Sequence, residues 1–423
     1  MGERDARGGV LVLGGGFAGA YVARLLGTRG ATIVSLENFM LYTPLLPEAA
    51  SGTLEPRHTV VPLRAMCPHS ELILGRATAI DLEARTVAVD TDGGPETVRW
   101  QELVLALGAV PRTVPVPGLV DNALSFKSLP EAIQLRNHVL RQLEDADAAL
   151  DPAERERRLT FVFVGAGYAG VEALAELSDL VADASRFYPG LNGVPRRWVL
   201  VDAAPAILPE IPPSLGNYAA EELAKRGVEI VVGTTLTSAG ADEVTLSDGQ
   251  RIPTRTLVWT AGVTPNPLVR ELGLPLDERG RIEVDEFLRV RGHEHVWSLG
   301  DNARVPNTRS PLPDPPTCQH ALRQARRLAK NIGGDLEPYG YRMMGQVATL
   351  GRYKGIAEVM GIPLRGFLGW WVTRSYHLYQ LPLLSRKLRV VVDWTTSLLF
   401  RRDVVELGSL GHPEGLERIS AGS

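Results

Sequence analysis

The sequence predicts an α/β protein with two parallel-sheet units and a C-terminal amphipathic helical region. Three observations predict this class. A G-x-G-x-x-G pattern follows the apolar run 10–13 and precedes a helical pattern, the same arrangement recurs after the apolar run 159–164, and residues 361–402 combine basic, aromatic and apolar side chains. A strand, a glycine turn and a helix fit a dinucleotide pyrophosphate, because the helix N-terminus offers free N–H groups and a positive dipole end. We therefore expect two Rossmann-like dinucleotide-binding domains.

The first glycine pattern has the features of a complete nucleotide-binding unit. Gly14 permits the tight turn, Gly16 lets the backbone approach the phosphates, and Gly19 lets the helix pack closely on the strand. Residues 32–36 read as the second strand, and Glu37 follows it directly. A carboxylate at this place can accept hydrogen bonds from both ribose hydroxyls of an adenine nucleotide.

The second pattern consists of Gly165, Gly167 and Gly170, again between an apolar strand and a helix. Two such patterns, each in strand, turn and helix context, predict that the chain binds two dinucleotides. Asp202 ends the next candidate strand and would select a free ribose 2′-hydroxyl, which favours NADH over NADPH. The neighbouring Arg196–Arg197 pair weakens that preference.

Other apolar runs suggest further strands. Residues 103–107 and 256–261 are each followed by a glycine, and residues 296–299 are followed by Gly300–Asp301. An aspartate at a strand's carboxyl end could hold a ribityl or ribose hydroxyl, or could equally cap a helix. Residues 72–74 and 86–89 are expected in a small β-layer, and residues 130–158 in a charged helix.

Composition limits the classes of function. The 423-residue chain is 44% hydrophobic and 22% charged with a net charge of −4, which gives no reason to expect nucleic acid binding. The two cysteines, Cys67 and Cys318, form no close pair, and the histidines are scattered, so we expect no metal site. No signal-peptide core and no run of ~18 apolar residues is present, so a cytoplasmic protein with peripheral membrane contact is expected.

Taken together, these motifs resemble the type II NADH:quinone oxidoreductases of the pyridine nucleotide-disulfide oxidoreductase superfamily, over residues 10–407. The resemblance implies FAD at the first pattern, NADH at the second, and Gly300–Asp301 closing over the flavin ribityl chain. Residues 43–47 are similar to the family's segment beside the isoalloxazine ring, and residues 315–321 to its quinone-site motif. The resemblance also implies a membrane quinone, menaquinone or ubiquinone, as the electron acceptor.

The resemblance assigns candidate roles to individual residues. Glu172 and Gln319 are the candidate catalytic residues, as proton donor and as hydrogen-bonding partner of a quinone carbonyl. Glu172 could equally be an acid favoured by the helix dipole. Cys318 replaces the family's usual alanine, and the family's second glutamine falls on Arg323, with Gln324 one position later. The expected cofactor-binding residues are Gly14, Gly16, Phe17, Ala18, Gly19, Glu37, Asn38, Pro44, Leu45, Ala77, Ala106, Leu107, Gly108, Gly165, Gly167, Tyr168, Gly170, Asp202, Ala261, Gly262, Gly300, Asp301, Gln319 and His320.

The C-terminal region predicts a membrane-surface element. Residues 361–402 hold seven basic residues against one acid, Asp393, and three of the seven tryptophans. Two helices separated at Pro382 are expected, and the second has an apolar face. That face consists of Leu388, Val391, Val392, Thr395, Leu398 and Leu399. Such a helix fits an anionic membrane surface, here the cytoplasmic face of the cell membrane, although a core-packing or dimer helix is the alternative.

These observations divide the chain into an FAD-binding domain at 1–113 and 256–345, an NADH-binding domain at 114–255, and a membrane-surface region at 346–423. The expected activity is NADH:quinone oxidoreduction without proton pumping. Two alternatives stay open: sulfide:quinone oxidoreduction, for which two isolated cysteines are poorly suited, and an NADH-responsive flavoprotein sensor. A homodimer is also left open.

Overall fold

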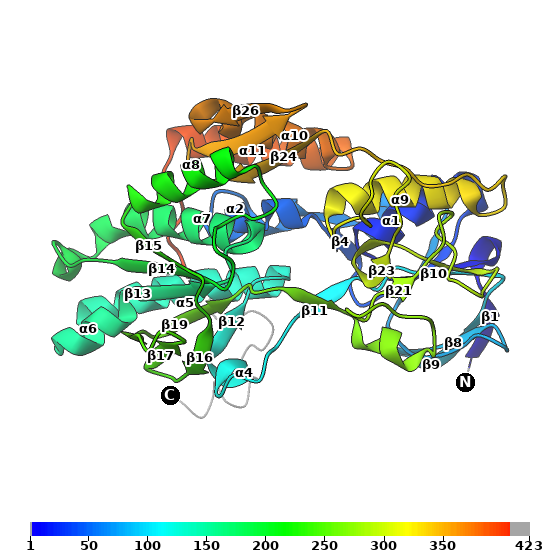
Figure 1. Ribbon diagram of the computed structural model, residues 1–423, viewed down its shortest axis with the longest axis horizontal. Coiled ribbons are helices and arrows are strands. Elements are labelled where there is room, and N and C mark those ends of the chain that lie inside the picture. The colour runs from blue at the N-terminus through cyan, green and yellow to red at the C-terminus, as the bar shows by residue number, and fades with distance from the viewer. Residues whose placement is uncertain (1, 407–423) are drawn as a thin grey trace, which may run out of the picture.

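The computed structural model describes residues 2–406, and its elements form two lobes with a C-terminal layer above them (Figure 1). The lobe on the right contains a parallel five-stranded sheet, and the lobe on the left contains a second one. The first sheet has the order β22 (Val296–Ser298), β10 (Glu102–Leu105), β2 (Val10–Leu13), β3 (Thr32–Ser35) and β6 (Glu71–Leu74). The second has the order β12 (Ala123–Ser125), β19 (Thr256–Trp259), β13 (Thr160–Val164), β14 (Arg197–Asp202) and β15 (Val228–Val232).

Both sheets have the buried, continuous apolar strands that parallel sheets require, because helices or further sheets cover both faces. β2 and β13 are fully buried along their lengths. Helix α1 (Phe17–Leu25) follows β2, and α7 (Tyr168–Ala184) follows β13. The expected Rossmann-like units are confirmed.

One strand prediction was wrong. Residues 72–74 belong to β6, at the edge of the first parallel sheet, and not to the small β-layer. The strand expected from residue 256 is present, and Thr256–Trp259 pairs with β13 in the second sheet. The chain leaves the first unit through β11 (Ala109–Pro111) and returns through β20 (Val263–Pro265), and these two strands pair with each other.

Smaller sheets and the remaining helices complete the two lobes. The β-layer has the order β1 (Gly2–Asp5), β9 (Gly94–Arg99), β8 (Thr86–Thr91) and β7 (Arg76–Asp81). Further sheets are β4 (Phe39–Leu41) with β5 (Val60–Pro62), β16 (Leu236–Ala239) with β17 (Glu243–Leu246) and β18 (Arg251–Pro253), and β21 (Ile282–Glu283) with β23 (Ala303–Arg304). The helices are α2 (Leu46–Ala50), α3 (Leu63–Met66), α4 (Leu119–Asn122), α5 (Leu129–Ala148), α6 (Pro152–Arg158), α8 (Pro213–Ala224) and α9 (Cys318–Asn331). The single helix expected at 130–158 is thus two helices.

The C-terminal layer consists of an antiparallel sheet and two helices (Figure 1). The sheet contains β24 (Gly345–Thr349), β25 (Gly355–Val359) and β26 (Ile362–Arg365). Helix α10 (Gly366–Gln380) packs on this sheet, and α11 (Leu384–Leu399) packs beside α10 and on residues 56–59 of the first unit. The break expected at Pro382 is confirmed, since Leu381–Leu383 separates the two helices.

Candidate functional site

A cavity of about 1160 Å³ lies where the two units and the C-terminal layer meet. It is lined by residues from the first glycine loop, the ends of β3 and β10, and the N-terminal part of α7. Its remaining walls come from the start of α9 and from α10. The predicted site residues among its lining are Gly14, Gly16, Phe17, Ala18, Glu37, Pro44, Ala77, Ala106, Leu107, Gly108, Tyr168, Glu172, Gly300, Asp301 and Gln319.

The first glycine loop has the conformation that the pattern requires. Gly14 has φ +112°, where a side chain would be strained and would run into the carbonyl oxygen of Ala106. A Cβ at Gly19 would strike the carbonyl oxygen of Gly14, so this position must be glycine for α1 to pack on β2. A Cβ at Gly16 would meet nothing within 4 Å. The open space at Gly16, beside the N-terminus of α1, fits a pyrophosphate.

The Gly300–Asp301 turn lies across the same cavity. Gly300 has φ +77°, and its N–H donates to Gln324 Oε1 at 2.8 Å. Gln324 in turn donates to Asp314 Oδ2 at 2.9 Å. Burial raises the pKa of Asp301, and Lys127, whose Nζ lies 4.0 Å from Asp301 Oδ2, opposes that rise. Gln324 therefore orients the turn, a role that the sequence did not reveal.

Asn302 links this turn to the end of β10. Its side-chain amide donates to the carbonyl oxygen of Leu105 at 3.1 Å and to Ser298 Oγ at 2.9 Å. Its Oδ1 accepts from the N–H of Gly108 at 3.1 Å. The buried Asn302 thus fixes the glycine at which β10 opens into the cavity.

The second glycine loop lies beside the cavity and does not line it. Gly165 has φ +111°, and a Cβ there would meet Thr260 and the N–H of Ala261. Among the predicted residues of this loop and its neighbours, only Tyr168 and Glu172 reach the cavity. Gly167, Gly170, Asp202, Ala261 and Gly262 are not among its lining. The second glycine loop therefore lies outside the cavity, and α7, which follows it, reaches the cavity through Tyr168 and Glu172.

Asp202 holds its own loop together. Its carboxylate accepts hydrogen bonds from the N–H groups of Ala166 and Ala204. These bonds place the acid at the carboxyl end of β14, next to the turn that follows β13. Each oxygen has a further lone pair, so both bonds are compatible with a ribose hydroxyl as an additional partner.

Glu172 is buried within the first turns of α7 and faces the cavity. The N–H of Thr349 donates to Glu172 Oε1 at 2.8 Å, and the Thr349 hydroxyl approaches it at 3.4 Å. Burial raises the pKa of Glu172 to about 8, although the Thr349 bonds lower it, and the acids Glu176 and Glu48 raise it further. Glu172 thus holds a proton near neutral pH at the cavity wall.

Gln319 lies at the start of α9 and also lines the cavity. Its Nε2 is 3.4 Å from the carbonyl oxygen of Gly345, and Tyr341 Oη is 3.4 Å from its Oε1. Both contacts are long for hydrogen bonds. The amide is therefore available to exchange these partners for a ligand. Arg323 does not replace a glutamine here, because its guanidinium stacks on the Tyr341 ring at 4.9 Å.

Cys318 and His320, which flank Gln319, lie in different surroundings. Cys318 lines the cavity, and burial raises the pKa of its thiol to about 12. Cys67 is buried in the core of the first unit and is not among the cavity's lining. His320, an expected cofactor residue, is also outside the lining: its Nδ1 lies 2.7 Å from Thr317 Oγ1 in the core.

Two more expected cofactor residues do not reach the cavity. Asn38 is exposed, and its carbonyl oxygen accepts from the N–H of Leu63. Leu45 is 1% exposed in the core of the first unit. Sequence reasoning also missed His377 on α10, which lines the cavity and whose Nδ1 is 3.4 Å from Tyr42 Oη. Burial lowers the pKa of His377 to about 4, so it is neutral at pH 7.

The outer face of the C-terminal layer is apolar. The exposed large apolar side chains of α10 and α11 are Phe367, Leu368, Trp371, Tyr379, Leu384, Leu388, Val391, Val392, Leu398 and Leu399. Leu399 is 78% exposed and Val392 60%. None of the helices within residues 2–406 has the length and apolar composition needed to cross a bilayer.

The fold and the cavity define a class: proteins with two Rossmann-like nucleotide units around a shared site. The family model described as pyridine nucleotide-disulphide oxidoreductase matches residues 8–325. The type II NADH:quinone oxidoreductase NdhA of Mycobacterium tuberculosis is 31% identical, with 95% of this chain and 90% of that protein covered. The demethylphylloquinone reductase NdbB of Synechocystis is 30% identical, over 93% and 96%. The chain belongs to the pyridine nucleotide-disulphide oxidoreductase family, and within it to the type II NADH:quinone oxidoreductases.

The fold is also that of a solved relative. NDH2 from Plasmodium falciparum, in a structure in complex with NADH, superposes with a TM-score of 0.87 over 94% of this chain and 99% of that one. The sequence identity is 16%, so this similarity concerns the fold.

Proposed function

We propose that the protein transfers two electrons from NADH to a membrane quinone. The observation that carries this proposal is the shared cavity, in which the first glycine loop faces a buried, protonated acid and an available amide. Relatives similar over nearly the whole chain are named for NADH and quinone. The two units and their cavity fit that reaction.

The first loop fits FAD. The tight turn at Gly14 and the open space at Gly16 fit the pyrophosphate, Glu37 the adenosine ribose, and Asp301 a ribityl hydroxyl. When bound, FAD supplies the redox chemistry by accepting two electrons and donating them onward. The chain's task is to hold both substrates against it and to exclude water.

The second loop is the proposed NADH site. The N-terminus of α7 would receive the pyrophosphate at Gly167, and Asp202 would receive the ribose hydroxyls. Tyr168 belongs to both surfaces, because it begins α7 and lines the cavity. NADH bound to this loop would extend along α7 into the cavity.

Glu172 and Gln319 are the proposed acceptor-side residues. Reduction of a quinone to a quinol consumes two protons, and Glu172 is protonated near neutral pH. The Gln319 amide would donate a hydrogen bond to a quinone carbonyl. Both residues line the cavity in which the quinone head group would bind.

Residues 361–402 are the proposed membrane-binding surface. The exposed apolar side chains of α10 and α11 would enter the interfacial layer, and the excess of basic residues would be attracted to anionic lipid. We propose the cytoplasmic face of the cell membrane as its location.

Stopped-flow absorbance tests the activity. The purified flavoprotein is reduced anaerobically with NADH and then mixed with a short-chain ubiquinone or menaquinone analogue. Rapid bleaching and rapid recovery of the flavin absorbance are expected. Bleaching without recovery would reject a quinone as acceptor, and absence of bleaching would reject NADH as donor.

A further inference from the structure

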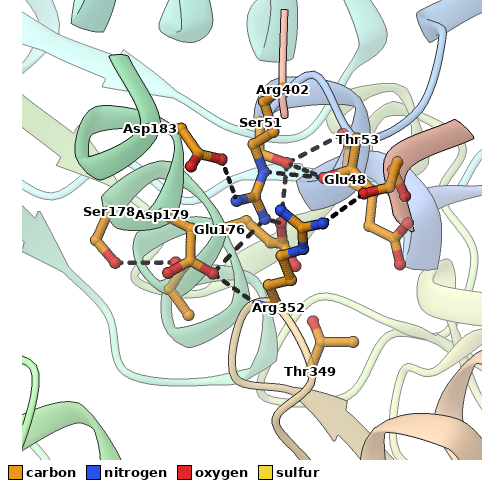
Figure 2. A network of polar contacts seen from close by, with 12 residues as sticks. Glu48, Ser51, Thr53, Glu176, Ser178, Asp179, Asp183, Thr349, Arg352 and Arg402 are labelled. Carbon is orange, nitrogen blue, oxygen red and sulfur yellow. Dashed lines mark hydrogen bonds and ion pairs between the residues drawn. The ribbon is translucent and has the colours of Figure 1, made fainter. Parts of the chain in front are cut away.

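Figure 2 shows a cluster of buried charges that includes Glu48, Glu176 and Arg402, none of which lines the cavity. Glu176 is one helical turn after Glu172 on α7, and Glu48 comes from α2 of the first unit. Both carboxylates are almost completely buried, with 1% and 3% of the residue exposed. Buried carboxylates are costly unless cations and hydrogen bonds compensate them.

The cations come from the C-terminal part of the chain. Arg402 Nη2 lies 2.8 Å from Glu176 Oε2, and Arg374 Nη2 lies 3.3 Å from Glu48 Oε2. Trp394, on α11, donates its indole N–H to the same Glu48 oxygen. Each buried acid is therefore compensated by a residue of, or directly following, the helices of the C-terminal layer.

Arg402 is the most fully engaged of these cations. Besides Glu176, it approaches Asp183 Oδ2 at 3.4 Å and donates from Nε to Thr53 Oγ1 at 3.0 Å. Figure 2 shows its guanidinium between these α7 acids and the Ser51–Thr53 segment. Arg136, on α5, holds the segment behind it by donating to the carbonyl oxygen of Asp403 at 2.5 Å.

Glu172 and Glu176 show what this arrangement does. Both acids are buried on one helix, with 8% of Glu172 and 1% of Glu176 exposed. Burial raises the pKa of Glu176, but Arg402, Arg374 and the Ser51 hydrogen bond outweigh it and lower that pKa. The pKa of Glu172 stays high, because burial and the neighbouring acids Glu176 and Glu48 outweigh the Thr349 hydrogen bonds. Glu176 therefore stays ionised one helical turn from Glu172. The positive charge of Arg402 offsets the electrostatic effect of that carboxylate on Glu172.

We propose that Arg402 is a positioning residue of the active site: acting through Glu176, it sets the proton affinity of Glu172. The inference deepens the proposed function and rests on Glu172 as the proton donor. Removing the Arg402 cation leaves the negative charge of Glu176 uncompensated at Glu172, so Glu172 holds its proton more tightly. Removing the Glu176 charge alone has the opposite effect.

The charged and titratable groups that face these two acids come from every element packed around them. They are Tyr168, Asp179 and Asp183 on α7, Glu48 on α2, Arg226 after α8, Arg352 after β24, Arg374 and His377 on α10, and Arg402 after α11. Asp179 is paired with Arg226 at 2.5 Å and also lies 3.6 Å from Arg402 Nη2, and His377 is neutral at pH 7. Arg402 and Arg374 are thus the cations that act on Glu176, and Arg402 lies in direct contact with it.

The test measures the titration of Glu172 in the flavin-loaded protein. The infrared band of its protonated carboxyl group, assigned by difference from Glu172→Gln, is followed against pH. Arg402→Gln should move the midpoint upward by about one pH unit, Glu176→Gln should move it downward, and the double variant should lie between them. Arg402→Lys, which keeps the charge, should lie near the unmodified protein.

Arg401→Gln is the matched control. Arg401 is the adjacent residue, is exposed, and makes no hydrogen bond or ion pair within residues 2–406. Its midpoint should not move. An unchanged midpoint in Arg402→Gln with a lowered melting temperature would overturn the inference and leave Arg402 as a structural clamp. If Arg402→Gln does not fold, an unchanged midpoint in Glu176→Gln would overturn it equally.

The pH profile of quinone reduction separates this inference from the function on which it rests. If Arg402→Gln shifts both the infrared midpoint and the profile, the inference and the role of Glu172 are both supported. If the midpoint shifts and the profile does not, Arg402 sets the proton affinity of Glu172, and the role of Glu172 as donor fails.

Discussion

The two nucleotide units have the same architecture but present their glycine loops differently. Gly14 and Gly165 have nearly the same φ, +112° and +111°, and each is followed by a helix that needs a glycine for close packing. The first loop lines the cavity of about 1160 Å³, whereas the glycines of the second do not. The same loop geometry thus serves a site within the shared cavity in one unit and a site at the cavity's edge in the other.

Glu37 and Asp202, the acidic residues that follow the second strand of each unit, also differ in their surroundings. Glu37 is exposed, lines the cavity, and its side chain makes no hydrogen bond within residues 2–406. Asp202 is bound by two N–H groups of its own unit. A site within the shared cavity suits a cofactor that stays bound, and a site at its edge with a preformed loop suits a substrate that exchanges each turnover. Under the proposed assignment, the position of each loop relative to the cavity, rather than its glycine pattern, separates the FAD loop from the NADH loop.

The largest expected effect comes from blocking the first glycine loop, which lines the cavity. Gly16→Val should fold, because Gly16 has an ordinary φ of −77° and open space at its Cβ position. The new side chain would stand where the pyrophosphate must approach. We expect almost complete loss of bound flavin, measured as flavin absorbance per chain in the purified protein, and hence loss of activity. Full flavin content would place FAD elsewhere.

Gly167→Val is the matched change in the second unit. Gly167 has φ −75°, and a Cβ there also meets nothing within 4 Å. Flavin content should be unchanged, whereas the affinity for NADH should fall about a hundredfold, or about 2.7 kcal/mol. Titration of the anaerobic protein with NADH measures it. Loss of flavin in this variant would break the division between the two loops.

Glu172→Gln tests the role of Glu172, through which helix α7 of the second unit lines the shared cavity. With a pKa of about 8, Glu172 loses its proton as the pH rises past 8, so kcat with a soluble quinone should fall there. The variant should lose this dependence and be slower by about tenfold to a hundredfold at pH 7. The rate of anaerobic flavin bleaching by NADH is the control and should change little.

Stability gives a second readout of Glu172. Its folded pKa lies above the value of about 4.3 of an unfolded glutamate. The folded protein therefore binds this proton more tightly, and the contribution of Glu172 to stability falls as the pH rises from about 4 to about 8. Urea unfolding across this window should show a shallower decline in Glu172→Gln, and an equal decline would contradict a raised pKa.

The smallest expected effect concerns the nucleotide preference of the edge site. Asp202→Asn keeps an acceptor for one of the two N–H groups but removes the negative charge that would repel a 2′-phosphate. The ratio of kcat/KM for NADPH to that for NADH should rise about tenfold, or about 1.4 kcal/mol. An unchanged ratio would remove Asp202 from the ribose site.

Sequence patterns correctly predicted the features that residues close together in the chain determine. Both glycine loops, their strands and helices, and the break at Pro382 follow from residues adjacent in sequence. The placement of Leu72–Leu74 in the parallel sheet was missed, because strand pairing depends on the neighbour and not on the strand itself. Gln324 was missed because its partners, Gly300 and Asp314, are brought together only by the fold.

The candidate site, like the fold, was predicted only in part. Glu172 and Gln319 were found through the resemblance, and their burial and hydrogen bonds were not. The buried charge cluster left no local pattern, since its acids and its cations lie far apart along the chain. A sequence alone does not say which arginine of many will be buried against a carboxylate.

That separation has a consequence for how the chain folds during synthesis. Arg402 lies 226 residues after Glu176, and Arg374 lies 326 residues after Glu48. At about 5–20 residues per second, the acids leave the ribosome on the order of ten seconds to a minute before their cations. Until then α2 and α7 would bury uncompensated carboxylates, so their interface should close late. The nascent protein would then contain both sheets while the contact between α2 and α7 is still incomplete. That contact would form fully once Arg402 has been synthesised.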